Sequence, residues 1–312
     1  MTIVICQAVI ILVLYPLYSR RVVKGVKSYM SYKYFDINGE VVQLSANMDK
    51  MISFNYCRDE TTGTFYTVVH IPQTDGRGNK QYPFTIWPNY PNGGTESPLQ
   101  MNKRLKFLVA MNGTGIKSPW GPGVTVSGGP LGTVIQNGVV LKEYISGEFG
   151  NPARTLTIDG NGTLGYAPLS ETGEQLVARG IISTASGYFP LIYNYDNIDE
   201  YESDIAEWLV SSATTNDAQR QVLCQYENGD YLIITSEGRG GQGGGYLTFK
   251  QMQSLCRKYG VKFAYILDGG GSAQTVYHDK ALNHIYENTY GRVMPTYIVF
   301  NGTTTFKASN AD

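Results

Sequence analysis

Short apolar runs rich in β-branched and aromatic residues, separated by glycine-containing turns, fill much of the chain from residue 32 onward. The first such runs lie at 32–37, 40–44, 53–57 and 65–71. Asn-Gly, Thr-Gly and Asp-Gly dipeptides follow these runs, and such dipeptides supply the positive φ angles of tight hairpin turns. Further paired runs lie at 133–143, 155–166 and 222–235. This pattern predicts a chain built largely from β-hairpins.

Helical periodicity is clearest at 249–259. Five apolar residues repeat there on one helix face: Phe249, Met252, Leu255, Cys256 and Tyr259. Thr248 can act as the N-cap in a capping box, and Gly260 is a natural terminator. Shorter helices are predicted at 99–105 and 171–179. Together these patterns predict an α+β fold, a strand-rich mixed-sheet domain with few helices.

The segment 1–29 is first apolar and then basic. Its apolar run at 3–17 is interrupted by a glutamine and a proline, and it is shorter than the roughly 20 residues of a bilayer span. Basic residues follow the run, whereas a secretory signal has them before it. We therefore expect no stable membrane span. We favour the hypothesis that translation begins at Met30, because the codons of 24–26 can form a purine-rich ribosome-binding site. Residues 1–29 would then be untranslated, or else disordered, and 30–312 are predicted to form a single domain.

Composition narrows the classes of partner. The chain has 25 Lys and Arg against 26 Asp and Glu, for a net charge of -1, so nothing in its charge favours nucleic acid or an anionic membrane. The 24 tyrosines and 36 glycines, with only 16% charged residues, suit tight turns and carbohydrate-facing aromatic surfaces. The four cysteines form no C-x-x-C pair and lie far apart, so we expect them to be reduced.

One apolar run, 263–267, stops abruptly at an acidic residue and three glycines. The sequence that follows it is Asp268, Gly269, Gly270, Gly271 and Ser272. Successive glycines adopt backbone angles closed to other residues, so main-chain N–H groups can converge on an anion beside the Asp268 carboxylate. The ordinary alternative is a glycine-rich turn capped by an aspartate. A second apolar run, 107–111, breaks in a similar way at Asn112-Gly113-Thr114-Gly115.

A glycine motif at 238–243 offers a competing interpretation. It matches G-x-G-x-x-G after a predicted strand, as in dinucleotide-binding proteins. In those proteins the helix begins within the motif, so that its N-terminus meets the pyrophosphate. Here two more glycines follow and the predicted helix begins only after Thr248. The surrounding chain is also rich in hairpins rather than alternating strands and helices. Dinucleotide binding therefore remains a remote alternative.

Several segments, in their order and spacing, resemble the phosphodiester glycosidase family, which has lysosomal, bacterial and phage members. They are Gln219-Arg220, Asn228-Gly229-Asp230, Glu237-Gly238-Arg239, the helix after Thr248, the stretch 267–272 and Gly291-Arg292-Val293. A weaker resemblance at 65–71 and Asn112-Gly113 extends the match to roughly 56–300. The family usually carries Asp-Gly-Arg where this chain has Glu237-Gly238-Arg239. Glutamate at position 237 keeps the negative charge of the aspartate, and its side chain is longer by one methylene group.

The resemblance implies a hydrolase that cleaves a sugar-1-phosphodiester at the anomeric carbon. It implies Asp268 as the acid/base or nucleophilic carboxylate, with Glu237 as its partner and Arg239 beside them. The remaining residues implied to bind substrate are Arg220, Asn112, Gly269, Gly270, Gly271, Ser272 and Arg292. Guanidinium groups suit this reaction because each can bind two phosphate oxygens. The ordinary alternatives are surface ion pairs for the arginines, a solvent-facing Glu237 and a turn-forming Asn112.

We expect no cofactor and no metal site, although Ca²⁺ or Mg²⁺ is not excluded, because no ligand-loop spacing is present. The expected partner is a sugar-phosphate diester in a bacterial or phage-targeted surface glycopolymer, such as a teichoic acid or capsule. The alternative is a glycan-binding phage tail or adhesion protein without turnover. The absence of a secretory signal favours a location on a phage virion or outside the cell after lysis, and otherwise in the cytoplasm.

Overall fold

The structure is a computed structural model that describes residues 51–74, 80–88, 90, 96–116, 129–211, 218–238, 245–285 and 291–300. All of them belong to one compact unit, Ser45–Asp312. The segment 1–29, the start at Met30 and the strands expected at 32–37 and 40–44 lie outside the described residues, and the single domain over 30–312 stays a prediction. None of the described helices is long and apolar enough to cross a membrane.

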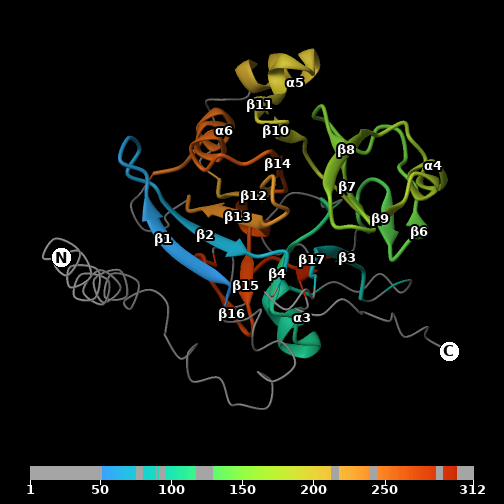
Figure 1. Ribbon diagram of the computed structural model, residues 1–312, viewed down its shortest axis with the longest axis horizontal. Coiled ribbons are helices and arrows are strands. Elements are labelled where there is room, and N and C mark those ends of the chain that lie inside the picture. The colour runs from blue at the N-terminus through green and yellow to red at the C-terminus, as the bar shows by residue number, and fades with distance from the viewer. Residues whose placement is uncertain are drawn as a thin grey trace, which may run out of the picture. The chain divides into compact units, whose positions relative to one another are not determined.

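The largest described sheet has seven strands and holds the central hairpin of the fold (Figure 1). Every neighbouring pair in it is antiparallel. In spatial order its strands are β1 (Ser53–Arg58), β2 (Phe65–Ile71), β13 (Tyr231–Ser236), β12 (Arg220–Gln225), β14 (Phe263–Ile266), β10 (Pro190–Tyr193) and β11 (Asp196–Asn197). The hairpins expected at 53–71 and 222–235 are confirmed within it.

Two five-stranded antiparallel sheets complete the described strands. One has the order β16 (Lys280–Ala281), β15 (Thr275–Tyr277), β4 (Val109–Asn112), β17 (Tyr297–Phe300) and β3 (Phe84–Ile86). The other has the order β6 (Val139–Lys142), β5 (Val134–Gln136), β9 (Ile181–Ser186), β7 (Arg154–Asp159) and β8 (Leu164–Pro168). The hairpins expected at 133–143 and 155–166 are those of β5–β6 and β7–β8.

Among the described residues, helices are few and short, as expected for this α+β fold. They are α3 (Pro98–Leu105), α4 (Gly173–Ala178), α5 (Ser203–Ser211) and α6 (Phe249–Lys258), with two 3₁₀ turns, η1 (Ile198–Glu200) and η2 (Gly270–Ser272). Ser97, Thr172 and Thr248 begin α3, α4 and α6 with capping boxes, which satisfy otherwise unpaired N–H groups. The sequence pattern did not indicate α5 or the 3₁₀ form of the glycine triplet.

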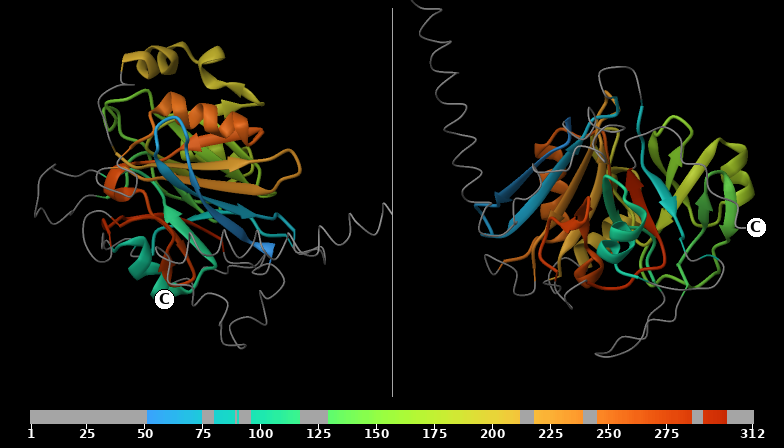
Figure 2. Two further views of the ribbon diagram at one scale, coloured as in Figure 1. Left: turned by 90° about the vertical axis from the view of Figure 1, so that its left-hand side faces the viewer. Right: turned by 90° about the horizontal axis from the view of Figure 1, so that it is seen from below.

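Helix α6 covers one face of the seven-stranded sheet (Figures 1 and 2). Its apolar residues are buried in one cluster with the side chains of β10, β12, β13 and β14 on that face. The other face of the hairpin meets the β15 strand through polar groups. The hydroxyl groups of Thr235 and Thr275 are 2.7 Å apart, and the Gln221 amide donates to Thr275 Oγ1 at 2.7 Å. The hairpin is thus held on both faces.

Candidate active site

Three strand ends meet at one edge of the seven-stranded sheet. In the register, Arg220 of β12 pairs with Ser236 of β13, and Val222 pairs with Ile266 of β14. Because β12 is antiparallel to both neighbours, its first residue lies beside the last residues of β13 and β14. This edge therefore holds Arg220, the start of the segment after β13, which is Glu237, and the loop after β14, whose second residue is Asp268.

The glycine triplet brings the Asp268 loop against the start of β12. Gly270 N donates to Gln219 O at 2.9 Å, and Ser272 N donates to Gly269 O at 3.2 Å. A Cβ on Gly269 would lie 2.5 Å from Gln219 O, and Gly270 has a φ of +60°, so both positions favour glycine. These two N–H groups already donate hydrogen bonds to main-chain oxygens of the protein. The expected anion cradle is therefore partly occupied by acceptors of the protein.

Asp268 lies among groups that favour its charged form, but burial outweighs them. Burial raises the pKa of its carboxyl, while the Ser272 hydroxyl, the charges of Arg292 and Arg220 and the Gly269 N–H oppose the rise. Arg292 Nη1 donates to Ser272 Oγ at 3.1 Å, so Ser272 links the guanidinium to the carboxyl. A carboxyl with a raised pKa beside two cations is suited to proton exchange and to charge stabilisation.

Arg220 is buried rather than engaged in a surface ion pair. Its residue exposure is 3%, and its Cζ lies 4.1 Å from the centroid of the Phe249 ring. Phe249 is the first residue of α6, directly after the capping Thr248. A guanidinium over an aromatic face keeps its charge and a fixed plane. The helix start thus orients the cation next to Asp268.

Asn112 joins the site from the second sheet. It is the last residue of β4 and is fully buried. Its Nδ2 donates to Asp268 O at 2.9 Å. Within the described part of the chain its Oδ1 accepts no hydrogen bond, which is costly for a buried acceptor unless water or a ligand supplies the donor. Asn112 therefore does more than form a turn.

Glu237 is fully buried and does not face solvent. Its carboxylate accepts hydrogen bonds from His284 N at 3.0 Å and from Gln219 Nε2 at 3.2 Å. Burial raises the pKa of Glu237, and these two bonds oppose the rise. Gln219 also receives the Gly270 N–H on its main-chain oxygen. Glu237 is thus connected to the Asp268 loop through Gln219.

Tyr188 is a member of the site that the sequence did not reveal. Burial raises the pKa of its hydroxyl to about 12, the charge of Asp268 adds to the rise and the charge of Arg220 opposes it. Its ring also lies 5.7 Å from that of Phe249. A Cβ on the preceding Gly187 would lie 3.7 Å from Asp268 N. The only signal is a glycine and a tyrosine directly after β9.

Two sequence features that were expected at this site fall outside the described residues. They are Arg239 and most of the glycine motif at 238–243.

Neither a metal site nor a dinucleotide-binding sheet is present in the described part of the chain. Where side chains are described, no three His, Cys, Asp or Glu residues are grouped to hold a metal ion. Every strand pair among the named strands is antiparallel, unlike the parallel sheet of a doubly wound dinucleotide-binding fold.

Comparison with known proteins gives a family match and a more distant relative. A family model described as phosphodiester glycosidase matches residues 106–301. The SPbeta prophage-derived uncharacterized protein YomE of Bacillus subtilis strain 168 is 25% identical over 272 residues. That alignment covers 80% of this chain and 38% of the relative, so the chain spans well under half of the relative's length.

Solved structures share the fold at low sequence identity. The catalytic domain of zebrafish N-acetylglucosamine-1-phosphodiester α-N-acetylglucosaminidase, auto-inhibited by its pro-peptide, has a TM-score of 0.56 and 17% identity, covering 80% of this chain and 82% of that chain. A hypothetical protein from Synechocystis has a TM-score of 0.51 and 12% identity, covering 80% of this chain and 62% of that chain. These matches establish likeness of fold.

Proposed function

Because the chain belongs to the phosphodiester glycosidase family of hydrolases, whose model matches residues 106–301, we propose that it cleaves a sugar-1-phosphodiester at the anomeric carbon. The observation that carries this proposal is the convergence on one sheet edge of a carboxyl with a raised pKa, Asp268, and two guanidinium groups, Arg220 and Arg292. A glycosidase needs a carboxylate next to the sugar carbon, where it stabilises or attacks the developing positive charge. A phosphate that leaves as an anion needs the cations.

In the proposed reaction, the bond between the anomeric carbon and the bridging oxygen breaks, and its electron pair leaves with the phosphate. The sugar carbon gains oxocarbenium character, which the Asp268 carboxylate stabilises or attacks. Water then supplies the new oxygen on the sugar and gives up a proton. The products are a reducing sugar and a phosphomonoester. Because that leaving group is weakly basic, it requires little help from a general acid.

The other site residues have supporting roles in this proposal. Asn112 Oδ1, which accepts no hydrogen bond from the described residues, can accept one from a buried water, and the Tyr188 hydroxyl lies within the electrostatic influence of Asp268. Glu237, the proposed partner carboxylate, acts by fixing Gln219 and the His284 main chain. Arg239 is retained as a proposed third phosphate-binding cation.

The proposed substrate is a surface glycopolymer joined by sugar-1-phosphate links, such as a teichoic acid or capsule. The prophage origin of one relative supports action from a phage virion, in a tail assembly, or outside the cell after lysis. The zebrafish enzyme is named for N-acetylglucosamine-1-phosphodiesters, which makes this sugar the first to test. The alternative is a phage tail or adhesion protein that binds the same glycan without turnover.

The experiment is to incubate the purified protein with N-acetylglucosamine-, glucose- and galactose-1-phosphodiesters of both anomeric configurations and to follow free reducing sugar. We expect release from at least one member of this panel, and we expect the Asp268→Asn variant to release none. An absence of release from the whole panel, with glycan binding intact, would favour the adhesion alternative.

A further inference from the structure

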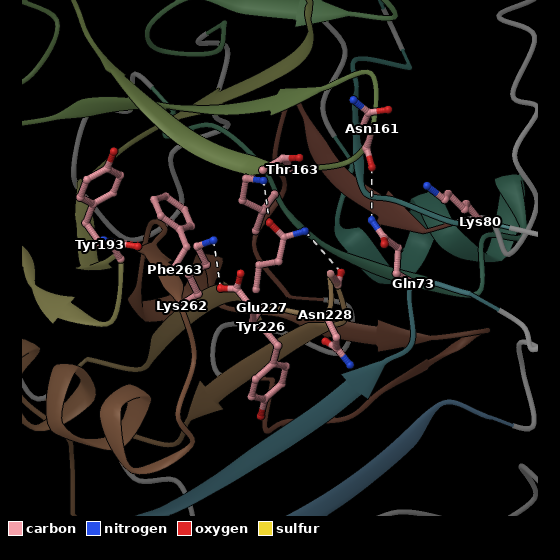
Figure 3. Close-up of a pocket in the computed structure, with 14 residues that line it drawn as sticks. Gln73, Lys80, Asn161, Thr163, Tyr193, Tyr226, Glu227, Asn228, Lys262 and Phe263 are labelled. Atoms are coloured by element: carbon pink, nitrogen blue, oxygen red, sulfur yellow. Dashed lines mark hydrogen bonds and ion pairs between the residues drawn. The ribbon is translucent and has the colours of Figure 1, made fainter.

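A pocket lies at the end of the β12–β13 hairpin that is opposite to Asp268. It has a volume of about 580 Å³ and is bordered by the β12–β13 turn and the β7–β8 turn (Figure 3). Strands rise about 3.3 Å per residue, so the five steps of β12 from Arg220 to Gln225 span about 17 Å. None of the site residues that surround Asp268 lines this pocket. The pocket is therefore distinct from the candidate active site.

Hydrogen bonds tie the two turns together beneath the pocket. The Gln225 side chain accepts a hydrogen bond from Leu164 N at 2.8 Å and donates to Gly162 O at 3.0 Å and to Gly229 O at 3.3 Å. Gln73 Nε2 donates to Asn161 O at 3.2 Å (Figure 3). Except for the bond to Gly229, these contacts join segments that belong to two different sheets or to their turns. The pocket is consequently pre-formed, which lowers the entropy cost of binding a ligand.

The pocket presents charged and amide groups together. Lys262 Nζ pairs with Glu227 Oε2 at 3.0 Å, and Tyr195 donates its hydroxyl hydrogen to the same oxygen at 2.6 Å. Lys80 lies on the other side of the pocket from Tyr193 (Figure 3). Such closely spaced donors and acceptors match the hydroxyl groups of a sugar, each of which both donates and accepts.

Exposed aromatic rings stand beside these polar groups. The exposed fractions of Tyr193 and Tyr195 are 40% and 43%. The Tyr193 ring makes edge contacts with Tyr166 at 5.3 Å and with Tyr201 at 5.4 Å, so neighbouring tyrosines hold it in place. An amphipathic tyrosine ring that is fixed yet exposed suits the apolar C–H face of a pyranose.

The turn that carries Tyr195 is strained. Asn194 and Tyr195 link β10 to β11 with φ angles of +51° and +74°. A two-residue hairpin turn with two positive φ angles is typically Asn-Gly, so tyrosine occupies a position that suits glycine. Residues held in such backbone regions are concentrated at functional sites. Here the strained conformation places the Tyr195 hydroxyl on Glu227 at the pocket.

We propose that this pocket is a second carbohydrate-binding site, which holds a sugar residue of a glycan chain between Tyr193 and the Lys262–Glu227 pair, with Tyr195 outside the lining and orienting Glu227. That this glycan is the polymer cleaved at Asp268 rests on the proposed function; the binding of a sugar does not. A polymer held at the pocket brings its phosphodiester links to a high effective concentration at the active site. A small diester gains nothing from the pocket.

The first test measures binding in an Asp268→Asn background, by calorimetric titration with chitotetraose, maltotetraose and a teichoic acid whose repeating sugars are joined through sugar-1-phosphate links. We expect at least one of these probes to bind, and Tyr195→Gly and Tyr193→Ala each to weaken that binding about tenfold. Tyr195→Gly restores the preferred residue of the turn, so it keeps the fold. The matched control is Tyr90→Ala, which removes another exposed tyrosine and should leave binding unchanged.

The second test compares two substrates of the otherwise unmodified enzyme. We expect the two tyrosine variants to raise KM for the teichoic acid and to leave kcat and KM for a small sugar-1-phosphodiester unchanged. Binding of none of the three probes, or equal binding by the variants and the control, would overturn the second site, and turnover of the small diester would then leave the proposed function standing. Binding without any turnover would support the second site while the proposed function fails.

Discussion

At the scale of single residues, the feature with the widest consequences is that burial raises the pKa of Asp268 although two guanidinium groups lie near it. An aspartate that only paired with arginines would have a lowered pKa. Asp268 instead combines a carboxyl that is costly to ionise with cations that can receive a phosphate. We interpret this balance as suited to a group that changes charge during the reaction.

This balance predicts how stability changes with pH. Since the pKa of Asp268 is raised in the folded state, its contribution to stability is fully present below the unfolded pKa of about 3.9 and is lost as pH rises through the folded value. Asp268→Asn removes that titration. We expect the melting temperature of the variant, relative to the wild type, to rise between about pH 4 and pH 7. Thermal unfolding across this range measures the difference.

A melting temperature for Asp268→Asn that falls relative to the wild type as pH rises would show that the ionised carboxylate stabilises the fold instead.

Tyr188 gives a prediction about activity at the same scale. Tyr188→Phe removes the hydroxyl near Asp268 and keeps the ring contacts with Phe249 and Trp208. We expect kcat/KM to fall only a few-fold, because the hydroxyl that the Asp268 charge acts on is lost while no hydrogen bond to the carboxyl is broken, with little change in melting temperature. Unaltered kinetics would remove Tyr188 from the site.

Reasoning from the sequence named Asp268 and Asn112 as candidates because each follows an apolar run, where polar groups are otherwise hard to explain. It named Arg220 because the segment around it resembles the family and a guanidinium suits a phosphate. It could not locate Tyr188. A tyrosine between two predicted strands has an ordinary explanation, and its closeness to Asp268 depends on long-range strand pairing. The burial of Glu237 was equally hidden, since it depends on His284 and Gln219.

At the scale of elements, the edge formed by β12, β13 and β14 decides which residues meet. The β12–β13 hairpin could be predicted from its Asn-Gly turn, and α6 from its apolar face and cap. The placement of β14 next to β12 could not. That pairing joins segments about 40 residues apart, and nothing local in the sequence selects it over another neighbour.

Helix α6 provides a test of the link between an element and the site. Thr248→Ala removes the capping side chain at the end of α6 that holds Phe249 under Arg220. We expect the free energy of unfolding to fall by about 1 kcal/mol, as for other lost N-caps, and kcat/KM to fall with it. Chemical denaturation and steady-state kinetics measure the two effects.

Thr172→Ala is the matched control, because Thr172 caps α4 with the same hydrogen-bond pattern. It should cost similar stability and leave kcat/KM unchanged, since α4 packs on the third sheet. Equal losses of activity in both variants would mean that stability, rather than the position of Phe249, limits the reaction.

At the scale of the whole molecule, the candidate site lies where the chain passes from one sheet to another. After β14 the chain runs through Asp268 and η2 into β15, which pairs with β4 of the second sheet, and Asn112 at the end of β4 reaches back to Asp268. The sequence predicts a strand-rich α+β fold, but not this crossing, because three antiparallel sheets can be joined in many ways. The zebrafish catalytic domain shares this architecture at 17% identity.

The hairpin of β12 and β13 then has a different role at each end. One end carries the proposed hydrolytic site and the other carries the proposed carbohydrate pocket, on strands that are buried along their length. Rigid strands of this kind hold two sites at a fixed separation. A polymeric substrate such as the proposed glycopolymer can exploit that separation, whereas a small metabolite cannot reach both sites.

The central claim is that the anomeric carbon–oxygen bond breaks, rather than a phosphorus–oxygen bond. Hydrolysis of a sugar-1-phosphodiester in ¹⁸O-labelled water, followed by mass spectrometry of both products, tests it most directly. We expect the label in the hydroxyl group of the released sugar, none in the phosphomonoester, and no product from Asp268→Asn. Label in the phosphomonoester, or undiminished release by Asp268→Asn, would contradict it.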